Sequence, residues 1–264
     1  PNGTGDLPFN ESNNIESILT LNNPIRKIAS VGTGLAPFAM QQGRDYSVLE
    51  NAIKLRPDEY RIHPQLGFIS LNRRLADSDV LAVSYQYTVN GDSKVYKVGE
   101  LTSDGIIAPD NIVVKLLRSE IISTEIPMWK LMMKNIYSLQ TYRMQPDGFR
   151  LELLYADDAT GVPINVLQNA KTSGVSEKTL LNIFNIDRLD QSQFYTPEGD
   201  GYFDYVEGVT INSEKGYIIF PSVEPFGKDL ETKLTDPEDE KYIFNELYTI
   251  TQSEARNNFQ HKDK

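Results

Sequence analysis

Histidine and cysteine, the usual carriers of nucleophilic and metal chemistry, are scarce in this 264-residue sequence, which has two His and no Cys. His63 precedes Pro64 at an expected turn, and His261 lies in a polar C-terminal stretch, so neither is placed as a general base would be. Without cysteine there is no disulfide, no thiolate nucleophile and no Cys-based zinc or iron–sulfur site. We expect His63 to have a packing or surface role and His261 to have none in chemistry.

Clusters of carboxylates are the remaining candidates, because calcium prefers hard oxygen ligands. The last of them occupies a Gly-rich acidic loop that lacks the alternating acids and the twelfth-position Glu of an EF-hand. Since the chain carries 37 acidic residues, such clusters arise freely, and solvated turns are the favoured interpretation. Calcium binding around Asp200, Asp204 and Glu207 stays open, and nothing selects a glycosidase-type pair for a carboxylate hydrolase. The clusters are Asp157 with Asp158, Asp187 with Asp190, and the group Glu198, Asp200, Asp204 and Glu207.

The motifs of the common enzyme classes are missing from the sequence. There is no G-x-S-x-G elbow, no Walker A loop, no H-E-x-x-H and no dinucleotide fingerprint. The Gly32-Thr33-Gly34 triplet is not followed by Lys-Ser/Thr, and Pro37 interrupts the helix that a phosphate loop requires, so residues 31–37 are predicted to be a turn or extended loop. The sequence therefore predicts a protein that is not an enzyme, with no catalytic residue, no cofactor and no metal ligand.

The amino-acid composition disfavours some classes of protein and some kinds of binding partner. The chain has 26 basic and 37 acidic residues, a net charge of −11, which disfavours nucleic acid and anionic membrane surfaces as partners. The hydrophobic share of 39% suits a packed core. No run of 18 apolar residues occurs, so no membrane-spanning helix is expected. Because the first residue is Pro1, the chain is interpreted either as a piece of something longer or as a processed mature form.

The elements that would position these side chains are mainly strands. Residues 81–89 alternate between apolar or aromatic and small or polar side chains, which predicts a half-buried strand. Asn90-Gly91 follows, a pair typical of a type I′ turn, and residues 95–98 supply the return strand. Turn residues and apolar patterns predict further strands at 67–71, 111–117, 149–155, 206–211 and 217–220.

Helical spacing of apolar residues predicts helices over residues 127–137 and 178–189, and a shorter one over 45–55 that Asp45 would cap. The last helix is the best capped, with Asp236 at the N-cap and Pro237 at the first helical position. The polar tail after Ala255 is expected to fray.

These elements predict an α+β fold of mainly antiparallel strands and hairpins with several short helices, which is not itself a transmembrane barrel. Residues 1–39 are predicted to be an extended arm or linker, residues 40–125 a first β-rich lobe, and residues 126–264 a second α+β lobe with a polar C-terminal tail.

A weak internal repeat relates residues 62–71 to residues 211–220. The first segment reads Ile-x4-Gly-Phe-Ile-x-Leu and the second reads Ile-x4-Gly-Tyr-Ile-x-Phe. Both a chance similarity of two hairpins and a duplication of two lobes explain this pattern.

Seven ordered stretches together resemble a known family. In length and order they are similar to the SprA (Sov) family, the very large outer-membrane translocons of the type IX secretion system in Bacteroidetes, also linked to gliding motility. The similarity spans roughly residues 40–250, in one internal segment of a much longer family chain. The stretches are residues 59–72 (EYRIHPQLGFISLN), 80–88 (VLAVSYQYT), 96–100 (YKVGE), 129–139 (WKLMMKNIYSL), 199–208 (GDGYFDYVEG), 225–227 (PFG) and 242–248 (YIFNELY).

The resemblance implies a non-enzymatic, soluble segment of such a translocon that acts as scaffold, cap or partner-docking part. It implies other translocon subunits and secreted cargo proteins as partners, no nucleic acid, and no membrane span in this segment. The implied location is an outer-membrane complex, on its periplasmic or extracellular side, and the family motif has no catalytic residue to carry over. The alternative is a calcium- or glycan-binding module of a bacterial cell-surface protein, although the 14 Tyr and 11 Phe fall mostly on predicted core faces.

Overall fold

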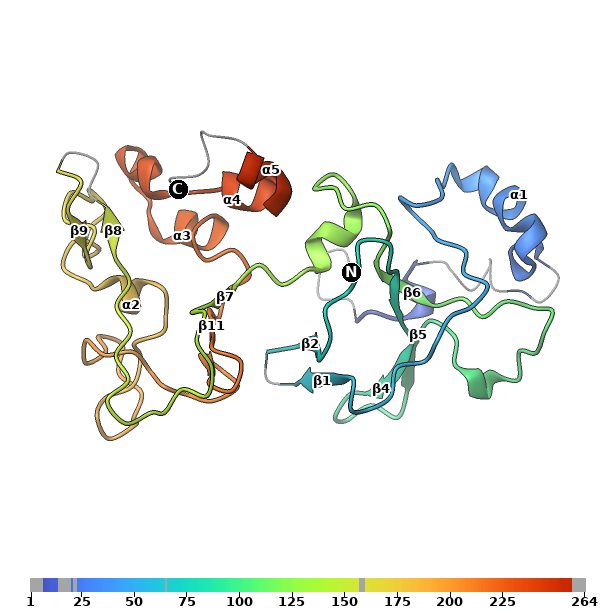
Figure 1. The fold of residues 1–264 in the computed structure, drawn as a ribbon, viewed down its shortest axis with the longest axis horizontal. Coiled ribbons are helices and arrows are strands. Elements are labelled where there is room, and N and C mark those ends of the chain that lie inside the picture. Colours follow the sequence, from blue (N-terminus) through green and yellow to red (C-terminus); the bar gives the residue numbers. More distant parts are fainter. Residues whose placement is uncertain (1–6, 14–19, 21–22, 65, 157–159, 258–264) are drawn as a thin grey trace. The chain divides into compact units, whose positions relative to one another are not determined.

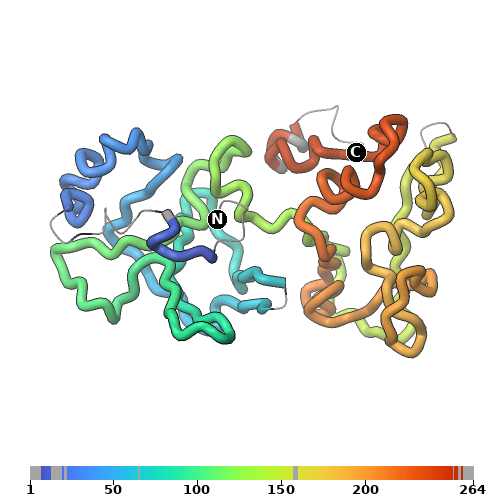
Figure 2. The backbone as a smooth tube through the Cα atoms, turned by 180° about the vertical axis from the view of Figure 1, so that it is seen from behind, coloured from blue at the N-terminus to red at the C-terminus, as the bar shows by residue number. Residues whose placement is uncertain are grey.

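The fold is α+β, as predicted, with short helices and small antiparallel sheets (Figure 1). The computed structural model describes residues 7–13, 20, 23–64, 66–156 and 160–257. The chain divides into two compact units, one of residues 1–59 and 73–132, the other of residues 60–72 and 133–264. Long loops connect the elements in both units (Figure 2), so side-chain bonds to the backbone must fix much of the chain.

The first unit contains two small sheets and several single helical turns. Strand β3 (Leu81–Val83) pairs with β6 (Lys115–Arg118), and β4 (Tyr85–Thr88) pairs with β5 (Val95–Val98). The helix α1 covers Val31–Leu35. The 3-10 helices among its described residues are Asn10–Asn13, Pro24–Arg26, Ile28–Ser30, Ala36–Phe38, Thr102–Asp104 and Pro127–Leu131.

The predicted hairpin of this unit is confirmed, and the predicted strand before it is divided. Tyr85 pairs with Val98 and Thr88 with Val95, but the predicted type I′ turn is wrong, because Gly91 has a φ of 87° whereas Asn90 does not have a positive φ. At Ser84 the extended chain changes partner, because β3 pairs with β6 and not with β5. Period-two alternation reports which face of a strand is buried, but it carries no information on which strand lies beside it.

The second unit contains the largest core. Its strands are β1 (Tyr60–His63), β2 (Phe68–Leu71), β7 (Ile136–Ser138), β8 (Tyr155–Ala156), β9 (Pro163–Ile164), β10 (Ile211–Asn212) and β11 (Tyr217–Ile219). Its helices are α2 (Leu180–Ile183), α3 (Lys228–Lys233), α4 (Glu246–Thr249) and α5 (Gln252–Asn257), with a 3-10 helix at Pro237–Tyr242. The sheets are β1-β2, β8-β9 and β10-β11-β7.

Aromatic rings pack edge to face at the centre of this core. Phe184 after α2, Phe220 after β11 and Phe226 before α3 have ring centroids 5.0 to 5.9 Å apart. Tyr137 of β7 adds a fourth ring, 5.6 Å from Phe220. Edge-to-face aromatic pairs stabilise a fold beyond the free energy gained by burying the rings. This cluster therefore helps to hold together a strand, a helix and two loops.

Two local predictions in the first unit are wrong. Residues 45–55 form turns and extended chain, because Asp45 caps the turn at Gln41 instead and both Leu49 and Ile53 stay exposed, so a helix here would have no surface to pack on. Residues 31–35 form α1 rather than a loop. Pro37 lies in the first turn of the next helix, Ala36–Phe38, where its missing N–H costs nothing.

The predicted helices of the second half of the chain are shorter than expected. Residues 127–137 form a 3-10 helix only to Leu131, and Ile136 then enters β7, where pairing with β11 outweighs helical spacing. The segment 178–189 is helical only at Leu180–Ile183 and ends before Asn185, which has a φ of 58°. Asp236 caps its helix as predicted, but that helix is 3-10 over Pro237–Tyr242.

The predicted strands are also shortened. The predicted strand at 111–117 is β6 at Lys115–Arg118, and that at 206–211 is reduced to β10. Residues 149–154 have no regular secondary structure, and of the predicted strand only Tyr155 pairs, in β8 (Tyr155–Ala156). The predictions for 67–71 and 217–220 are confirmed as β2 and β11.

The two segments of the internal repeat form equivalent hairpins, both in the second unit. Ile62 pairs with Ile69 in β1-β2, and Ile211 pairs with Ile218 in β10-β11. The turn glycines have φ values of 69° at Gly67 and 68° at Gly216. The sequence similarity therefore corresponds to one shared local structure with the same register.

Candidate functional site

The buried carboxylate of Asp187 organises the acidic loop that the sequence singled out. Its Oδ1 accepts the N–H of Asp200 at 2.9 Å, and its Oδ2 accepts the N–H of Gly201 at 3.2 Å. The hydroxyl of Thr179, which caps α2, donates to Oδ2 at 3.4 Å. The loop is thus wrapped around a carboxylate that comes from the segment after α2.

Asp204, at the C-terminal end of the loop, binds the segment that follows α2. Its Oδ2 accepts the N–H of Arg188 at 2.6 Å, and its Oδ1 accepts the N–H of Leu189 at 3.1 Å. The amide of Asn182 in α2 donates to the carbonyls of Asp187 and Pro197, at 3.0 and 3.2 Å. We call this set the carboxylate cradle: Asp187, Asp204, Asn182, Thr179 and the loop 197–204.

Burial raises the pKa of both cradle aspartates above the ordinary value. For Asp187 the N–H groups of Asp200 and Gly201 oppose this rise, and the charge of Asp200 adds to it. For Asp204 the N–H groups of Arg188 and Leu189 oppose it. The oxygens of both carboxylates therefore accept hydrogen bonds from backbone N–H groups of the chain.

Three other acidic candidates, Asp190, Asp200 and Glu207, also serve local turns. Asp190 accepts the N–H groups of Ser192 and Phe194, Asp200 accepts that of Tyr202, and Glu207 accepts that of Ser213. In the part of the chain that the structure describes, no three His, Asp or Glu side chains are grouped so that they could hold a metal ion. Asp157 and Asp158 lie outside the described residues.

His63 lies buried on the packed face of the β1-β2 hairpin. Its Nε2 is 3.0 Å from Oγ of Ser70, and its ring stacks on Phe68 with centroids 4.1 Å apart. Burial lowers the pKa of His63, and the charges of Arg61 and Lys215 lower it further. A neutral, stacked imidazole fits the packing role expected from the sequence, and His261 lies outside the described residues.

A small pocket of about 50 Å³ lies beside the cradle, lined by residues that include Arg150, Glu152, Asn165, Thr179 and Tyr202. Ligand pockets of proteins typically measure roughly 300 to 1,000 Å³. This pocket therefore has room for ordered water but not for a sugar ring or a nucleotide.

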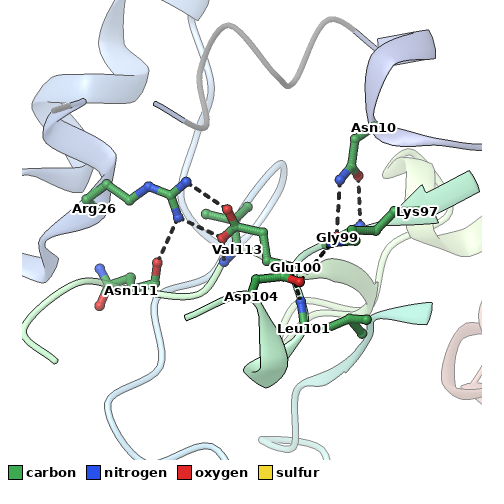
Figure 3. A network of polar contacts seen from close by, with 9 residues as sticks. All are labelled: Asn10, Arg26, Lys97, Gly99, Glu100, Leu101, Asp104, Asn111 and Val113. Atoms are coloured by element: carbon green, nitrogen blue, oxygen red, sulfur yellow. Dashed lines mark hydrogen bonds and ion pairs between the residues drawn. The ribbon is translucent and has the colours of Figure 1, made fainter. Parts of the chain in front are cut away.

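The sequence analysis missed the buried ion pair of the first unit, between Arg26 and Glu100. Both guanidinium NH groups donate to the carboxylate at 2.7 Å, so the pair is bidentate (Figure 3). Glu100 Oε2 also accepts the N–H of Val113, and Arg26 donates to the carbonyl of Asn111. Hydrogen bonding to Glu100 raises the pKa of Arg26.

Figure 3 shows two further contacts in this network. The side chain of Asn10 both donates to the carbonyl of Gly99 and accepts its N–H, at 3.1 and 2.8 Å. On the surface, Lys97 pairs with Asp104, which also accepts the N–H of Leu101. The network fixes the N-terminal segment to β5 and its following turn. Nothing in the spacing of Arg26 distinguishes it from exposed arginines, whereas Glu100 ends one of the stretches that resemble the family.

A fourth buried carboxylate, Asp239 in the 3-10 helix Pro237–Tyr242, was also missed. Its oxygens accept the N–H of Lys171 at 2.7 Å and both the N–H and the hydroxyl of Thr172, at 2.8 and 2.6 Å. Burial alone would raise the pKa of Asp239, but these donors lower it. Asp187, Asp204 and Asp239 thus share one role, because each binds backbone N–H groups of a distant loop.

Replacing Gly199 by alanine should destabilise the second unit more than replacing Gly201, its neighbour in the same loop. Both have positive φ, 66° and 84°, which costs a side-chain-bearing residue about 1 kcal/mol or more. A Cβ at Gly199 would in addition overlap the carboxylate of Asp187, whereas a Cβ at Gly201 meets open space. Chemical denaturation should show the larger loss for Gly199→Ala, and equal losses would contradict the cradle.

Comparisons with protein-family models and with curated proteins find no match for this chain. Among the described residues, no helix has the length and apolar character needed to span a membrane. The arguments for function therefore come from the residues and their contacts.

Proposed function

We propose that this chain is a non-enzymatic segment of a SprA-like type IX secretion translocon, serving protein secretion and gliding motility as a scaffold, cap or partner-docking part. The proposal places it in a bacterial outer-membrane complex, with other translocon subunits and secreted cargo as partners. The observation that carries it is the role of the residues that give the resemblance: they hold the chain's loops in place.

Each of several resembling stretches contributes such a residue. Glu100 forms the buried ion pair with Arg26, and the loop at 199–204 forms the carboxylate cradle. Asn135 donates its side-chain amide to the carbonyl of Phe220, whose N–H binds the carbonyl of Asn135. Tyr248 accepts the N–H of Phe226 through its hydroxyl. Motifs made of such residues are what a family with a shared architecture and no shared reaction would keep.

The internal use of the carboxylates also supports a structural role. A general acid or base must reach a substrate proton, and a metal ligand needs a free lone pair directed at the ion. The oxygens of Asp187, Asp204 and Asp239 instead accept backbone N–H groups. This arrangement resists movement of the loops, and it leaves the carboxylate oxygens occupied by hydrogen bonds within the chain.

Deleting residues 40–250 from the chromosomal gene of the strain that encodes the chain would test the proposal. We expect cargo with a C-terminal sorting domain to accumulate inside the cells and colony spreading to stop. The variant Gly199→Ala should reduce secretion through loss of folded chain, while Gly201→Ala, its matched control, should secrete much nearer to the wild-type level. Normal cargo secretion in the deletion strain would overturn the proposal.

A further inference from the structure

The turn at the tip of the β4-β5 hairpin consists of Asn90 and Gly91, and both residues are exposed. The chain reverses there through one hydrogen bond, in which Asp92 donates its N–H to the carbonyl of Val89 at 3.0 Å. Gly91 has a φ of 87° whereas Asn90 has no positive φ, which is the pattern of a type II turn. The pair therefore lies in a tight turn that water can reach.

An asparagine that precedes glycine lies next to a nucleophile, the backbone nitrogen of the glycine. When the nitrogen of Gly91 attacks Cγ of Asn90, a bond forms between these two atoms and the bond between Cγ and Nδ2 breaks. Nδ2 leaves as ammonia with the proton of the Gly91 N–H, and a five-membered succinimide ring remains. One water molecule opens this ring at either carbonyl, which gives aspartate or isoaspartate, whose main chain runs through the β-carbon. Glycine favours the attack because it has no Cβ to hinder a close approach.

Within the part of the chain that the structure describes, both reacting groups of this turn are free. Gly91 donates its N–H to no acceptor, and the side-chain amide of Asn90 makes no hydrogen bond. The next side chain, Asp92, is occupied, because it accepts the N–H of Lys94 at 2.9 Å and the hydroxyl of Tyr96 at 2.6 Å. Neither the attacking nitrogen nor the amide that it attacks has to break a hydrogen bond before the reaction.

The acidic loop of the second unit shows the opposite case. Gly201 follows Asp200, and its N–H donates to Oδ2 of the buried Asp187 at 3.2 Å. Oδ1 of Asp200 accepts the N–H of Tyr202 at 3.0 Å. The fold thus holds both groups that would have to react, and a charged carboxylate is in addition a poorer electrophile than an amide.

The hairpin that carries the Asn90-Gly91 turn also holds the segment around Phe9. Tyr87 and Tyr96 lie opposite each other in β4 and β5 and stack with ring centroids 5.3 Å apart. The hydroxyl of Tyr87 donates to the carbonyl of Pro8 at 3.1 Å, and Phe9 packs edge to face on Tyr96. The ammonium group of Lys94, next to the turn, lies 4.4 Å from the centre of the Phe9 ring. A change in the turn therefore reaches the contacts of this segment.

We propose that Asn90 is a site of spontaneous modification, which converts to aspartate and isoaspartate through a succinimide formed with Gly91. Isoaspartate adds one atom to the backbone of the turn, so it disturbs the pairing of Thr88 with Val95 and loosens the segment around Phe9. The modified form accumulates with the age of the folded chain and needs no enzyme. This inference is independent of the proposed function, since it rests on the hairpin and its turn alone.

The test compares the folded full chain with synthetic peptides of residues 87–94 and 197–204, all kept at pH 8 and 37 °C. Peptide mapping by mass spectrometry measures the exchange of the Asn90 amide for an acid, and an isoaspartyl methyltransferase labels isoaspartate at either site. We expect Asn90 to react in the folded chain within a factor of about three of its rate in the peptide. Asp200, the matched control, should react at least tenfold more slowly in the folded chain, because its loop binds the buried carboxylate of Asp187.

A second measurement tests the effect of the modification on the first unit. Chromatography separates the isoaspartate form from the aged, ¹⁵N-labelled chain. In this form we expect the amide of Gly99, which donates to the side chain of Asn10 at 2.8 Å, to exchange with solvent at least threefold faster than in fresh chain (Figure 3). The variant Asn90→Asp has the same added charge but an ordinary backbone, so its Gly99 amide should exchange as in fresh chain.

Four results would each overturn the inference. They are a rate at Asn90 more than threefold below that of the peptide, which would mean that the turn protects it; no slowing at Asp200, which would mean that hydrogen bonding does not decide the rate; unchanged exchange of Gly99 in the isoaspartate form; and equally fast exchange in Asn90→Asp, which would assign the effect to charge.

Discussion

Arg26→Met is expected to lower the free energy of unfolding of the first unit by about 3–5 kcal/mol, because it leaves the buried carboxylate of Glu100 without its cation. The remaining donor to Glu100 in the network, the N–H of Val113, cannot compensate a full charge. The carbonyl of Asn111 also loses a donor. Trp129, the single tryptophan of the chain, belongs to this unit, so its fluorescence during urea denaturation reports the loss.

Two control variants identify the cause of this loss. Lys97→Met breaks the exposed pair with Asp104 and should cost about 0–1 kcal/mol, the usual value for surface pairs. The double variant Arg26→Met, Glu100→Met removes both charges and should recover a large part of the stability, since well-packed apolar side chains can replace a buried pair. If Arg26→Met costs no more than Lys97→Met, the ion pair does not hold the N-terminal segment.

Asp239→Asn is expected to destabilise the second unit by about 2–3 kcal/mol, because one acceptor oxygen becomes an amide donor that faces a buried backbone N–H or the Thr172 hydroxyl. The matched control is Asp236→Asn in the same helix. Its oxygen caps the N–H of Glu238, and asparagine caps as well as aspartate does, so this change should be nearly neutral. Thermal unfolding followed by circular dichroism compares the two variants.

The cost of Asp239→Asn should depend on pH in a definite direction. The pKa of Asp239 lies below its ordinary value of 3.8 in the folded chain, so the ionised carboxylate stabilises the fold above pH 3.8. This contribution is lost as the pH falls through the folded pKa. The difference between wild type and variant should therefore be constant from pH 5 to pH 7 and shrink below about pH 4. A difference that grows on acidification would contradict the assignment.

The elements predicted best from the sequence are those with a local cause. The β4-β5 hairpin follows from alternation and an Asn-Gly turn, and the cap at Asp236 follows from its own side chain. The division at Ser84 and the entry of residues 136 and 137, which were predicted to be helical, into β7 depend on strands far away in the chain. Short elements in a loop-rich fold are decided by such distant contacts, which no local pattern records.

The residues of the candidate site could likewise be predicted from the sequence only where the cause is local. Acidic residues near turns could be identified as turn residues, but the favoured interpretation of solvated turns is wrong for Asp187 and Asp204, which are buried. That Asp187 binds the loop from which Asp204 binds back could not be foreseen, because Asp187 and Gly201 lie 14 positions apart and nothing in the sequence between them indicates that they meet. Arg26 belongs to no recognisable sequence pattern. Its burial can be recognised only in the structure, where Glu100 lies beside it.

The division of the chain has a consequence for its dissection. Because residues 60–72 belong to the second unit while residues 73–132 return to the first, the backbone passes between the units after Glu59, after Asn72 and after Met132. A single proteolytic cut after Met132 would release a fragment that still carries β1 and β2 but lacks the remainder of their unit. The second unit cannot be obtained intact by truncation from one end, so a gene for this unit alone would have to join the hairpin to residue 133 through a new linker.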